Sequence, residues 1–280
     1  VLESQRADWG EKSLVEFLER LGDHAAVALA NAQLYKDIQA ANLAKSEFVS
    51  FVAHELKNPM TSIKGYTDLL AAKAVGPIND AQANFLAVIR SNTDRMNSLV
   101  SDLNDLSKIE AGRMRLDYAR LSLNELVAEV DRSARKQIEE KQQSFNVDIP
   151  ADCWNIWADR TRLTQILVNL VSNATKYTEP GGTIFLGANN TIEDGAGAAP
   201  LRMVHVWVQD TGIGISPGDQ QKVFQKFFRA EDPKTRETPG TGLGLNITRS
   251  LVEMQGGRIW FESVFRQGTT FHVLMPVAED

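Results

Sequence analysis

The sequence predicts a multidomain α and α/β protein: a helical hairpin forming a dimeric four-helix bundle with an N-terminal coiled coil, followed by a two-layer α/β sandwich. The 280 residues are enough for two domains at roughly 100–200 residues each. Residues 14–110 are almost free of strand signals, with one break at Gly76 and Pro77. After about Arg120, short alternating runs and amphipathic segments follow one another, which indicates two-layer α/β packing.

Gly76 and Pro77 predict a turn between two long helices. The second helix carries an apolar row whose steps alternate four and three, as in the seam of a coiled coil or four-helix bundle. The row consists of Phe85, Ile89, Asn92, Met96, Leu99, Leu103 and Leu106. A single polar residue in such a seam, here Asn92, is a known way to fix register.

The first helix has two heptad phases, one in residues 14–35 and another in residues 34–52. The change of phase near Leu34 and Ile38 predicts a local change in supercoiling, where a signal could be transmitted. Two helices meeting at a small break are the alternative. Because two helices cannot enclose a four-helix core, we expect the hairpin to pair with a second copy as a homodimer.

The remainder is expected to alternate helices and strands. Helices are predicted at residues 124–141, 159–176, 217–228 and 243–255, and strands at 145–149, 183–188, 203–208, 258–263 and 269–275. The last two strands form a hairpin, and the loop at residues 194–200, rich in Ala and Gly, is expected to be mobile.

Composition excludes several classes of protein. The formal net charge of −6 argues against sequence-independent nucleic-acid binding, and the single cysteine, Cys153, excludes an intrachain disulfide framework or a cysteine-rich zinc site. No apolar run approaches the roughly 18–20 residues of a membrane span. The chain begins at Val1, so we expect a piece of a longer protein that is cytoplasmic, with any membrane anchor lying upstream.

Two glycine clusters, residues 210–216 and 240–245, are either turns or places where the backbone approaches a phosphate. Neither has the spacing of a P-loop, and the second is one residue short of the dinucleotide fingerprint. A third segment is more specific. Asn169, Asn173, Lys176 and Tyr177 share one helix face, where amide oxygens suit Mg²⁺ and a lysine suits phosphate.

Of the four histidines, His54 differs from His24, His205 and His272, for which a structural role is expected. If its helical neighbours two positions away face the seam, the imidazole of His54 projects into solvent, where it can act as a nucleophile near pH 7. Glu55 is adjacent and can hold the proton on the other ring nitrogen. Asn58 lies one turn on, and a proline after it is expected to kink the helix.

In combination, these residues resemble sensor histidine kinases of two-component systems. Residues 54–59 resemble the phosphoacceptor box, 169–178 the N box, 210–215 the G1 box, 224–229 the F box and 240–245 the G2 box. Residues 17–35 are also similar to the last helix of a GAF-type sensor domain. The resemblance implies a HisKA-type dimerisation domain and a Bergerat-type ATP-binding domain, and we expect boundaries at residues 1–46, 47–119 and 120–280.

The resemblance also implies residue roles. Asp210 is expected to accept a hydrogen bond from the adenine amino group, Asn169 to ligate Mg²⁺ and Arg229 to reach the terminal phosphate of ATP. Glu55 is the expected general base and Asn58 the residue that orients water for dephosphorylating the partner. The remaining ATP-binding residues are Asn173, Lys176, Tyr177, Gly212, Gly214, Ile215, Gly240, Thr241, Gly242, Leu243 and Gly244, and residues 230–239 are the expected lid.

The implied activity is ATP-dependent autophosphorylation of His54 and transfer to an aspartate of a separate response regulator receiver domain. Two alternatives stay open. An ATPase clamp does not need His54 and its hairpin, and a non-catalytic dimeric scaffold does not need Asp210, Asn169 and both glycine loops.

Overall fold

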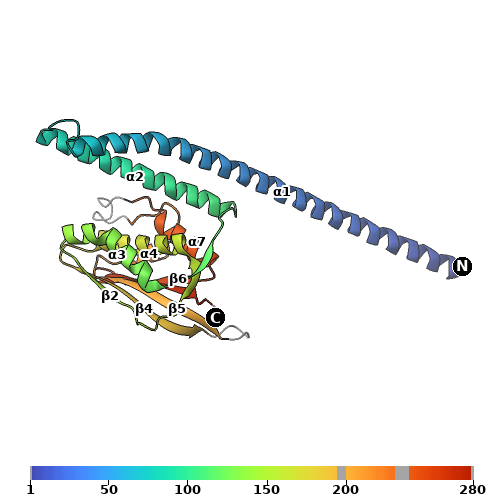
Figure 1. Ribbon diagram of the computed structural model, residues 1–280. Coiled ribbons are helices and arrows are strands. Elements are labelled where there is room, and N and C mark those ends of the chain that lie inside the picture. The colour runs from blue at the N-terminus through green and yellow to red at the C-terminus, as the bar shows by residue number, and fades with distance from the viewer. Residues whose placement is uncertain (1, 194–199, 231–239, 279–280) are drawn as a thin grey trace.

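The computed structural model describes residues 2–193, 200–230 and 240–278, with side chains from residue 14 onward, and shows a helical hairpin beside an α/β domain (Figure 1). Helix α1 (Leu2–Ala71) is continuous through Pro59 and turns into α2 (Asp80–Glu110) by way of Gly76, whose φ is 134°. The alternative of two helices in place of α1 is therefore wrong. The N-terminal part of α1 projects away from the rest of the chain.

A capping box fixes the start of α2. The side chain of Asn79 accepts a hydrogen bond from the Gln82 backbone nitrogen at 2.8 Å, and the Gln82 side chain accepts one from the Asn79 nitrogen at 2.9 Å. These two bonds satisfy backbone donors that a helix start leaves without partners. The turn predicted from Gly76 and Pro77 is confirmed.

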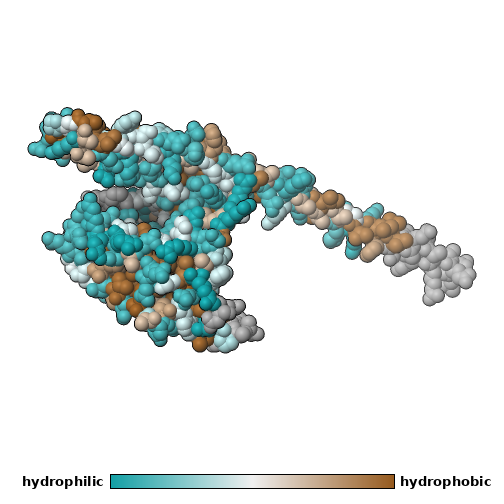
Figure 2. All heavy atoms as spheres, in the orientation of Figure 1, coloured by the Kyte–Doolittle hydropathy of each residue, from teal (hydrophilic) through white to brown (hydrophobic). Residues whose placement is uncertain are grey.

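The two helices of the hairpin pack along rows that repeat every seven residues. The buried members are Ser46, Ala53, Met60 and Thr67 on α1 and Thr93 and Ser107 on α2. The apolar row predicted on α2 lies beside this contact: Phe85 is 68% exposed and Met96 is 48% exposed, and of the row only Leu106 is buried. Within one chain the row is therefore uncovered. Hydrophobic side chains of the projecting part of α1 are also exposed, as the brown patches in Figure 2 show.

The α/β domain contains a five-stranded sheet of order β2-β4-β5-β7-β6, in which β2 and β4 are parallel and the other neighbours antiparallel. Its elements are β1 (Tyr118–Leu121), α3 (Leu123–Glu140), β2 (Ser144–Asp148), β3 (Ile156–Asp159), α4 (Arg160–Tyr177), β4 (Thr183–Glu193), β5 (Leu201–Asp210), α5 (Pro217–Gln220), α7 (Gly244–Met254), β6 (Arg258–Val264) and β7 (Gly268–Pro276). Helices α3, α4 and α7 cover one face of the sheet (Figure 1).

The core lies between that helical layer and the sheet. Leu163, Ile166, Leu167 and Leu170 on one face of α4 are fully or almost fully buried, as are Ile184 and Leu186 of β4. The apolar face expected for this helix is therefore the one that packs, which places its polar face away from the core. The predicted fold class, a helical hairpin followed by an α/β sandwich, is confirmed.

The structure corrects two details. The helix expected at residues 217–228 is only α5, because residues 221–228 form successive turns and Phe227 has a φ of 60°. The sequence also missed β1 and β3, which form a separate two-stranded antiparallel sheet of four residues each. Of the loop expected at residues 194–200, all but Pro200 lies outside the described residues. None of the described helices is long and apolar enough to cross a membrane.

Candidate functional site

A cleft of about 1460 Å³ lies between α2 and the ends of α4, β5 and α7. Most of the expected ATP-binding residues line it: Asn169, Asn173, Lys176, Tyr177, Asp210, Gly214, Ile215, Arg229, Gly240, Thr241, Gly242 and Gly244. The fold thus brings together four segments of the sequence, residues 169–177, 210–215, 229 and 240–244. Gly212 and Leu243 are not among the lining residues, and both act behind the surface of the cleft, as described below.

Asp210 ends β5 with its side chain buried. The carboxylate accepts hydrogen bonds from the backbone nitrogens of Gly212 at 2.9 Å and Thr269 at 3.3 Å. Burial raises the pKa of Asp210 to about 6, and these two bonds partly oppose the shift. A carboxylate fixed by backbone donors at the floor of a cleft is suited to accept a hydrogen bond from an amino group of a planar ligand.

The C-terminal end of α4 is held by two side chains from the segment before β2. Lys141 Nζ donates to the carbonyl oxygens of Thr175 at 2.8 Å and Lys176 at 2.9 Å, and Gln143 Nε2 donates to that of Thr178 at 2.7 Å. A cation at a helix C-terminus also compensates the helix dipole. These contacts fix the turn that carries Lys176 and Tyr177 into the cleft.

Asn169 is oriented by a neighbour on α7. Its Nδ2 donates to Oγ1 of Thr248 at 2.7 Å, and Thr248 is only 2% exposed. A Cβ at Gly244 would come within 2.6 Å of Asn169 Oδ1. Glycine is therefore required at the start of α7 for the amide to occupy this place.

Positive charge gathers beside α4. Burial lowers the pKa of Lys176, partly offset by the nearby charge of Asp102 on α2. Burial raises the pKa of Tyr177, opposed by the positive charge of Arg229. Lys176 and Arg229 therefore bring two positive charges to one cleft.

The glycine loops are shaped by close backbone approach. A Cβ at Gly212 would lie 2.4 Å from the Tyr177 carbonyl oxygen, and Gly214 and Gly242 have φ values of 63° and 72°. A Cβ at Gly240 would meet nothing within 4 Å among the described residues, so their packing does not demand glycine there. Leu243 is buried, and its nitrogen donates to Thr241 Oγ1 at 3.1 Å, which fixes that side chain. Of the expected lid, all but Ala230 lies outside the described residues.

His54 lies on α1 with its side chain 73% exposed, as the helical phase predicted. Its Nδ1 is 3.7 Å from Glu55 Oε1, so the expected acid–base partner is adjacent. Asn58 is exposed one turn further along α1. None of these three residues is among those that line the cleft. The structure therefore does not bring the expected phosphoacceptor together with the expected nucleotide site.

The α/β domain is instead docked on α2. Asp105 accepts hydrogen bonds from Arg162 Nη1 at 3.0 Å and Gln165 Nε2 at 2.9 Å, and Asp102 accepts one from Thr241 Oγ1 at 2.9 Å. Glu110 makes a third contact, to Lys226. Sequence reasoning missed these carboxylates. Their only signal was acidic residues at positions of α2 outside the apolar row.

The other three histidines make contacts within the fold, away from the cleft. His24 contacts the carbonyl oxygen of Arg20 on the same helix. His205 and His272 lie 3.1 Å apart, Nε2 to Nδ1, on the strands β5 and β7. Trp260 stacks on both rings, with centroids 5.4 and 5.0 Å away. This aromatic group lies outside the cleft.

Comparison with known proteins follows the same division. Residues 44–112 match the family model of the His Kinase A (phospho-acceptor) domain, and residues 158–279 match that of the Histidine kinase-, DNA gyrase B-, and HSP90-like ATPase. The chain is 34% identical to the circadian input-output histidine kinase CikA of Synechococcus elongatus over 93% of its residues and 37% of the relative's. It is 33% identical to the histidine protein kinase DivJ of Caulobacter vibrioides over 91% of this chain and 40% of DivJ.

Solved structures agree. Full-length ShkA in complex with AMPPNP superposes with a TM-score of 0.65 and 26% identity, covering 84% of this chain and 46% of ShkA. The histidine kinase ThkA in complex with the response regulator protein TrrA superposes with a TM-score of 0.53 and 28% sequence identity, covering 83% of this chain and 61% of ThkA. The chain therefore contains the two domains that these family models describe and is similar to histidine kinases over most of its length, and it spans less than half the length of CikA or DivJ.

Proposed function

We propose that this chain is the catalytic part of a sensor kinase that transfers the γ-phosphoryl group of ATP to His54 and from there to an aspartate of a separate response regulator. The observation that carries the proposal is an exposed histidine beside a carboxylate on one domain and a polar cleft with lysine, arginine and two glycine loops on the other. Relatives named as histidine kinases, one of them solved with a response regulator protein, support it.

ATP is the proposed occupant of the cleft. Asp210 would accept a hydrogen bond from the adenine amino group, while Lys176 and Arg229 would neutralise phosphate charge. Asn169 would supply a hard oxygen ligand for Mg²⁺, and the fit is reasonable because Thr248 holds the amide nitrogen and leaves the carbonyl oxygen for a cation. When bound, Mg²⁺ neutralises phosphate charge.

In the transfer step, a ring nitrogen of His54 attacks the γ-phosphorus in line, a nitrogen–phosphorus bond forms, and the bond to the bridging oxygen breaks to release ADP. Glu55 stabilises the proton on the other ring nitrogen, for which the 3.7 Å separation is suitable after a small side-chain rotation. Asn58 is proposed to orient a water molecule when the same hairpin dephosphorylates the regulator. Because His54 lies outside the cleft, transfer requires the α/β domain to leave its docked position on α2.

A second copy of the chain completes the hairpin in this proposal. The exposed row of apolar residues on α2 is the surface that a four-helix bundle would bury. We further propose domain boundaries at residues 1–46, 47–119 and 120–280. The first segment would continue a GAF-type sensor domain that lies upstream. The intact protein would be cytoplasmic or anchored to a membrane ahead of Val1.

The proposal is tested by incubating the chain with γ-³²P-labelled ATP and Mg²⁺. Acid-labile, base-stable label is expected on the wild type and on the His24→Gln control, whose side chain is also exposed on α1, and no label is expected on His54→Gln. Label that persists on His54→Gln would contradict the assignment. ATP hydrolysis without any labelled protein would favour the ATPase clamp, and ATP binding without either would favour the scaffold.

A further inference from the structure

The contact between Asp102 and the second glycine loop has a consequence for nucleotide binding. Asp102 Oδ2 accepts a hydrogen bond from the Thr241 hydroxyl at 2.9 Å, and that hydroxyl in turn accepts a hydrogen bond from the Leu243 nitrogen at 3.1 Å. The carboxylate thus lies against the loop that leads into α7. Both Asp102 and Thr241 line the cleft.

The surroundings of Asp102 resemble those of a bound phosphate. Lys176, the lysine of the N box, attracts its charge across the cleft, while Thr241 donates to it directly. Burial raises the pKa of Asp102, the hydrogen bond from Thr241 opposes that shift, Asp105 adds to it, and Lys176 lowers it. Asp102 on α2 therefore uses the positive charge of Lys176, which the proposed function assigns to the phosphates, and the hydroxyl of Thr241, one of the expected ATP-binding residues.

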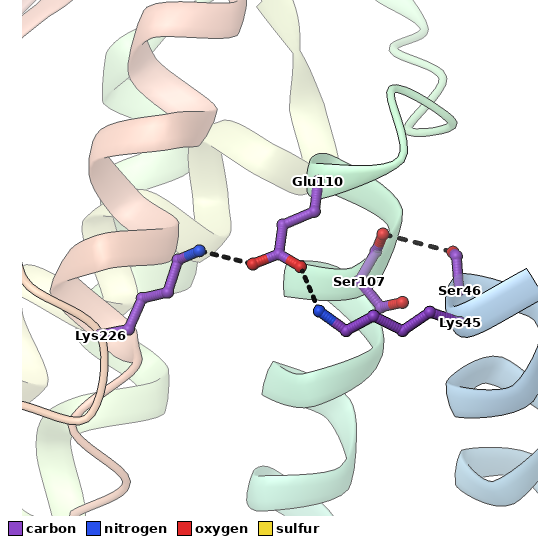
Figure 3. Close-up of polar contacts among 5 residues, drawn as sticks. All are labelled: Lys45, Ser46, Ser107, Glu110 and Lys226. Carbon is purple, nitrogen blue, oxygen red and sulfur yellow. Dashed lines mark hydrogen bonds and ion pairs between the residues drawn. The ribbon is translucent and has the colours of Figure 1, made fainter. Parts of the chain in front are cut away.

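Two further contacts hold Asp102 at this place. Asp105, three residues on, binds Arg162 and Gln165 at the start of α4. Glu110 lies between Lys226 of the α/β domain and Lys45 of α1, with the second pair 3.1 Å apart, as Figure 3 shows. Close to it, Ser46 Oγ donates to the Ser107 carbonyl oxygen at 3.2 Å, which ties α1 to the same turn of α2.

The Glu110 anchor is suited to a reversible contact. Glu110 and its two lysines are 33%, 64% and 45% exposed, and ion pairs of that kind add little net stability and are screened by salt. Asp105 and Arg162 are more buried, with side chains 10% and 21% exposed. The docked domain also leaves His54 outside the cleft. The arrangement is therefore one that must open for phosphoryl transfer.

We propose that the acidic face of α2, Asp102, Asp105 and Glu110, is a docking surface for the chain's own nucleotide-binding face, with Asp102 occupying the place of a nucleotide phosphate and competing with the triphosphate of ATP. This inference rests on the proposed function. Because coupling between two ligands is reciprocal, binding of ATP displaces Asp102 and frees the domain to reach His54, while docking lowers the affinity for ATP.

The test compares Asp102→Asn with Asp80→Asn. The first keeps an acceptor for Thr241 and removes the charge. The second makes the same change on the same helix, at the exposed first residue of α2, which is not among the residues that line the cleft. Binding of ATP with Mg²⁺ and of adenosine is measured by calorimetry on both variants and the wild type, with far-ultraviolet circular dichroism to establish that each is folded.

We expect Asp102→Asn to bind ATP at least about fivefold more tightly, the lower end of typical coupling between sites, while its affinity for adenosine is unchanged. Asp80→Asn should bind both as the wild type does. An unchanged or weaker affinity of Asp102→Asn for ATP would overturn the inference and leave the proposed function intact. An equal gain for adenosine would also overturn it, because general opening of the cleft would then be the cause. Failure of every form to bind ATP would contradict the proposed function itself.

A second measurement does not depend on affinity. Amide hydrogen exchange at residues 98–106 is expected to rise in the wild type when ATP is added, because displacement of Asp102 exposes this part of α2. In Asp102→Asn the same residues should exchange faster before ATP is added. Exchange that does not change with ATP, in a protein that calorimetry shows to bind it, would contradict the displacement.

Discussion

Substitution of Gly244 by alanine separates the shape of the site from the stability of the fold. A Cβ at this position would lie 2.6 Å from Asn169 Oδ1, whereas ordinary contact begins at 3.4 Å, so the amide must retreat by about 0.8 Å. Its hydrogen bond to Thr248, 2.7 Å long, would be lost or bent by such a shift. The atom that moves is the one proposed to face Mg²⁺.

The expected magnitude follows from that displacement. Misplacing a catalytic group by about 1 Å costs on the order of 100-fold in rate, so autophosphorylation of Gly244→Ala should fall by roughly that factor. Stability should not fall in parallel, because alanine is favoured over glycine within a helix by about 1 kcal/mol and Gly244 begins α7.

The assay is the initial rate of ³²P incorporation, with thermal unfolding measured on the same samples. Gly218→Ala is the matched control, since a Cβ there meets nothing within 4 Å and Gly218 lies in α5, outside the cleft lining. Its rate should equal that of the wild type. A Gly244→Ala protein with normal rate and normal dependence on Mg²⁺ would refute the idea that the Asn169 amide is held in place for the metal.

Three further predictions address other parts of the chain. Because burial raises the pKa of Asp210 to about 6, the carboxyl group keeps its proton in the folded state at pH values where the unfolded state has lost it. The free energy of unfolding should therefore decline between pH 3.8 and about 6, by up to about 3 kcal/mol. Asp210→Asn should abolish that decline in denaturant titrations, and an unchanged pH profile of the variant would contradict the prediction. Thr248→Val removes the acceptor for the Asn169 amide and should raise the Mg²⁺ concentration needed for ATP binding several-fold. Thr248→Ser should restore the wild-type requirement, and adenosine binding should be unaffected in both variants. An equal loss of adenosine binding would indicate a packing defect instead. Met96→Lys places a charge in the exposed apolar row of α2 and should yield monomers in sedimentation experiments. The control Ser101→Lys, at an exposed position of the same helix, should remain a dimer. A monomeric wild type would contradict the paired hairpin.

Much of the fold was accessible from pattern alone. Heptad spacing, the Gly76 turn and the apolar face of α4 each depend on local periodicity, so the sequence predicted the hairpin and the main helix of the domain correctly. The short strands β1 and β3 are only four residues long, and they pair across an intervening helix and strand. No local signal marks that pairing.

The site shows the same limit. Helical phase predicted that His54 is exposed, because that depends only on residues within a few turns of it. The residues expected in the cleft were instead implied by the resemblance to sensor histidine kinases; they lie in segments far apart in the sequence, and most of them line the cleft. The docking of the domain on α2 depends on carboxylates whose partners lie 57 or more positions away in the sequence, the shortest separation being that of Asp105 and Arg162. Sequence spacing does not predict contacts between separate domains. That is why Asp102, Asp105 and Glu110 carried no functional expectation until their partners were visible.

The most direct measurement is the location of the phosphoryl group itself. After brief incubation with ATP and Mg²⁺, the protein is digested at neutral or alkaline pH, which preserves phosphohistidine, and the peptides are mapped by mass spectrometry. One phosphoryl group on the peptide that contains His54, absent when the chain carries Asp210→Ala, is the predicted result. Phosphate on His24, His205, His272 or a hydroxyl side chain, with His54 unmodified, would contradict transfer from the cleft to the exposed histidine of α1.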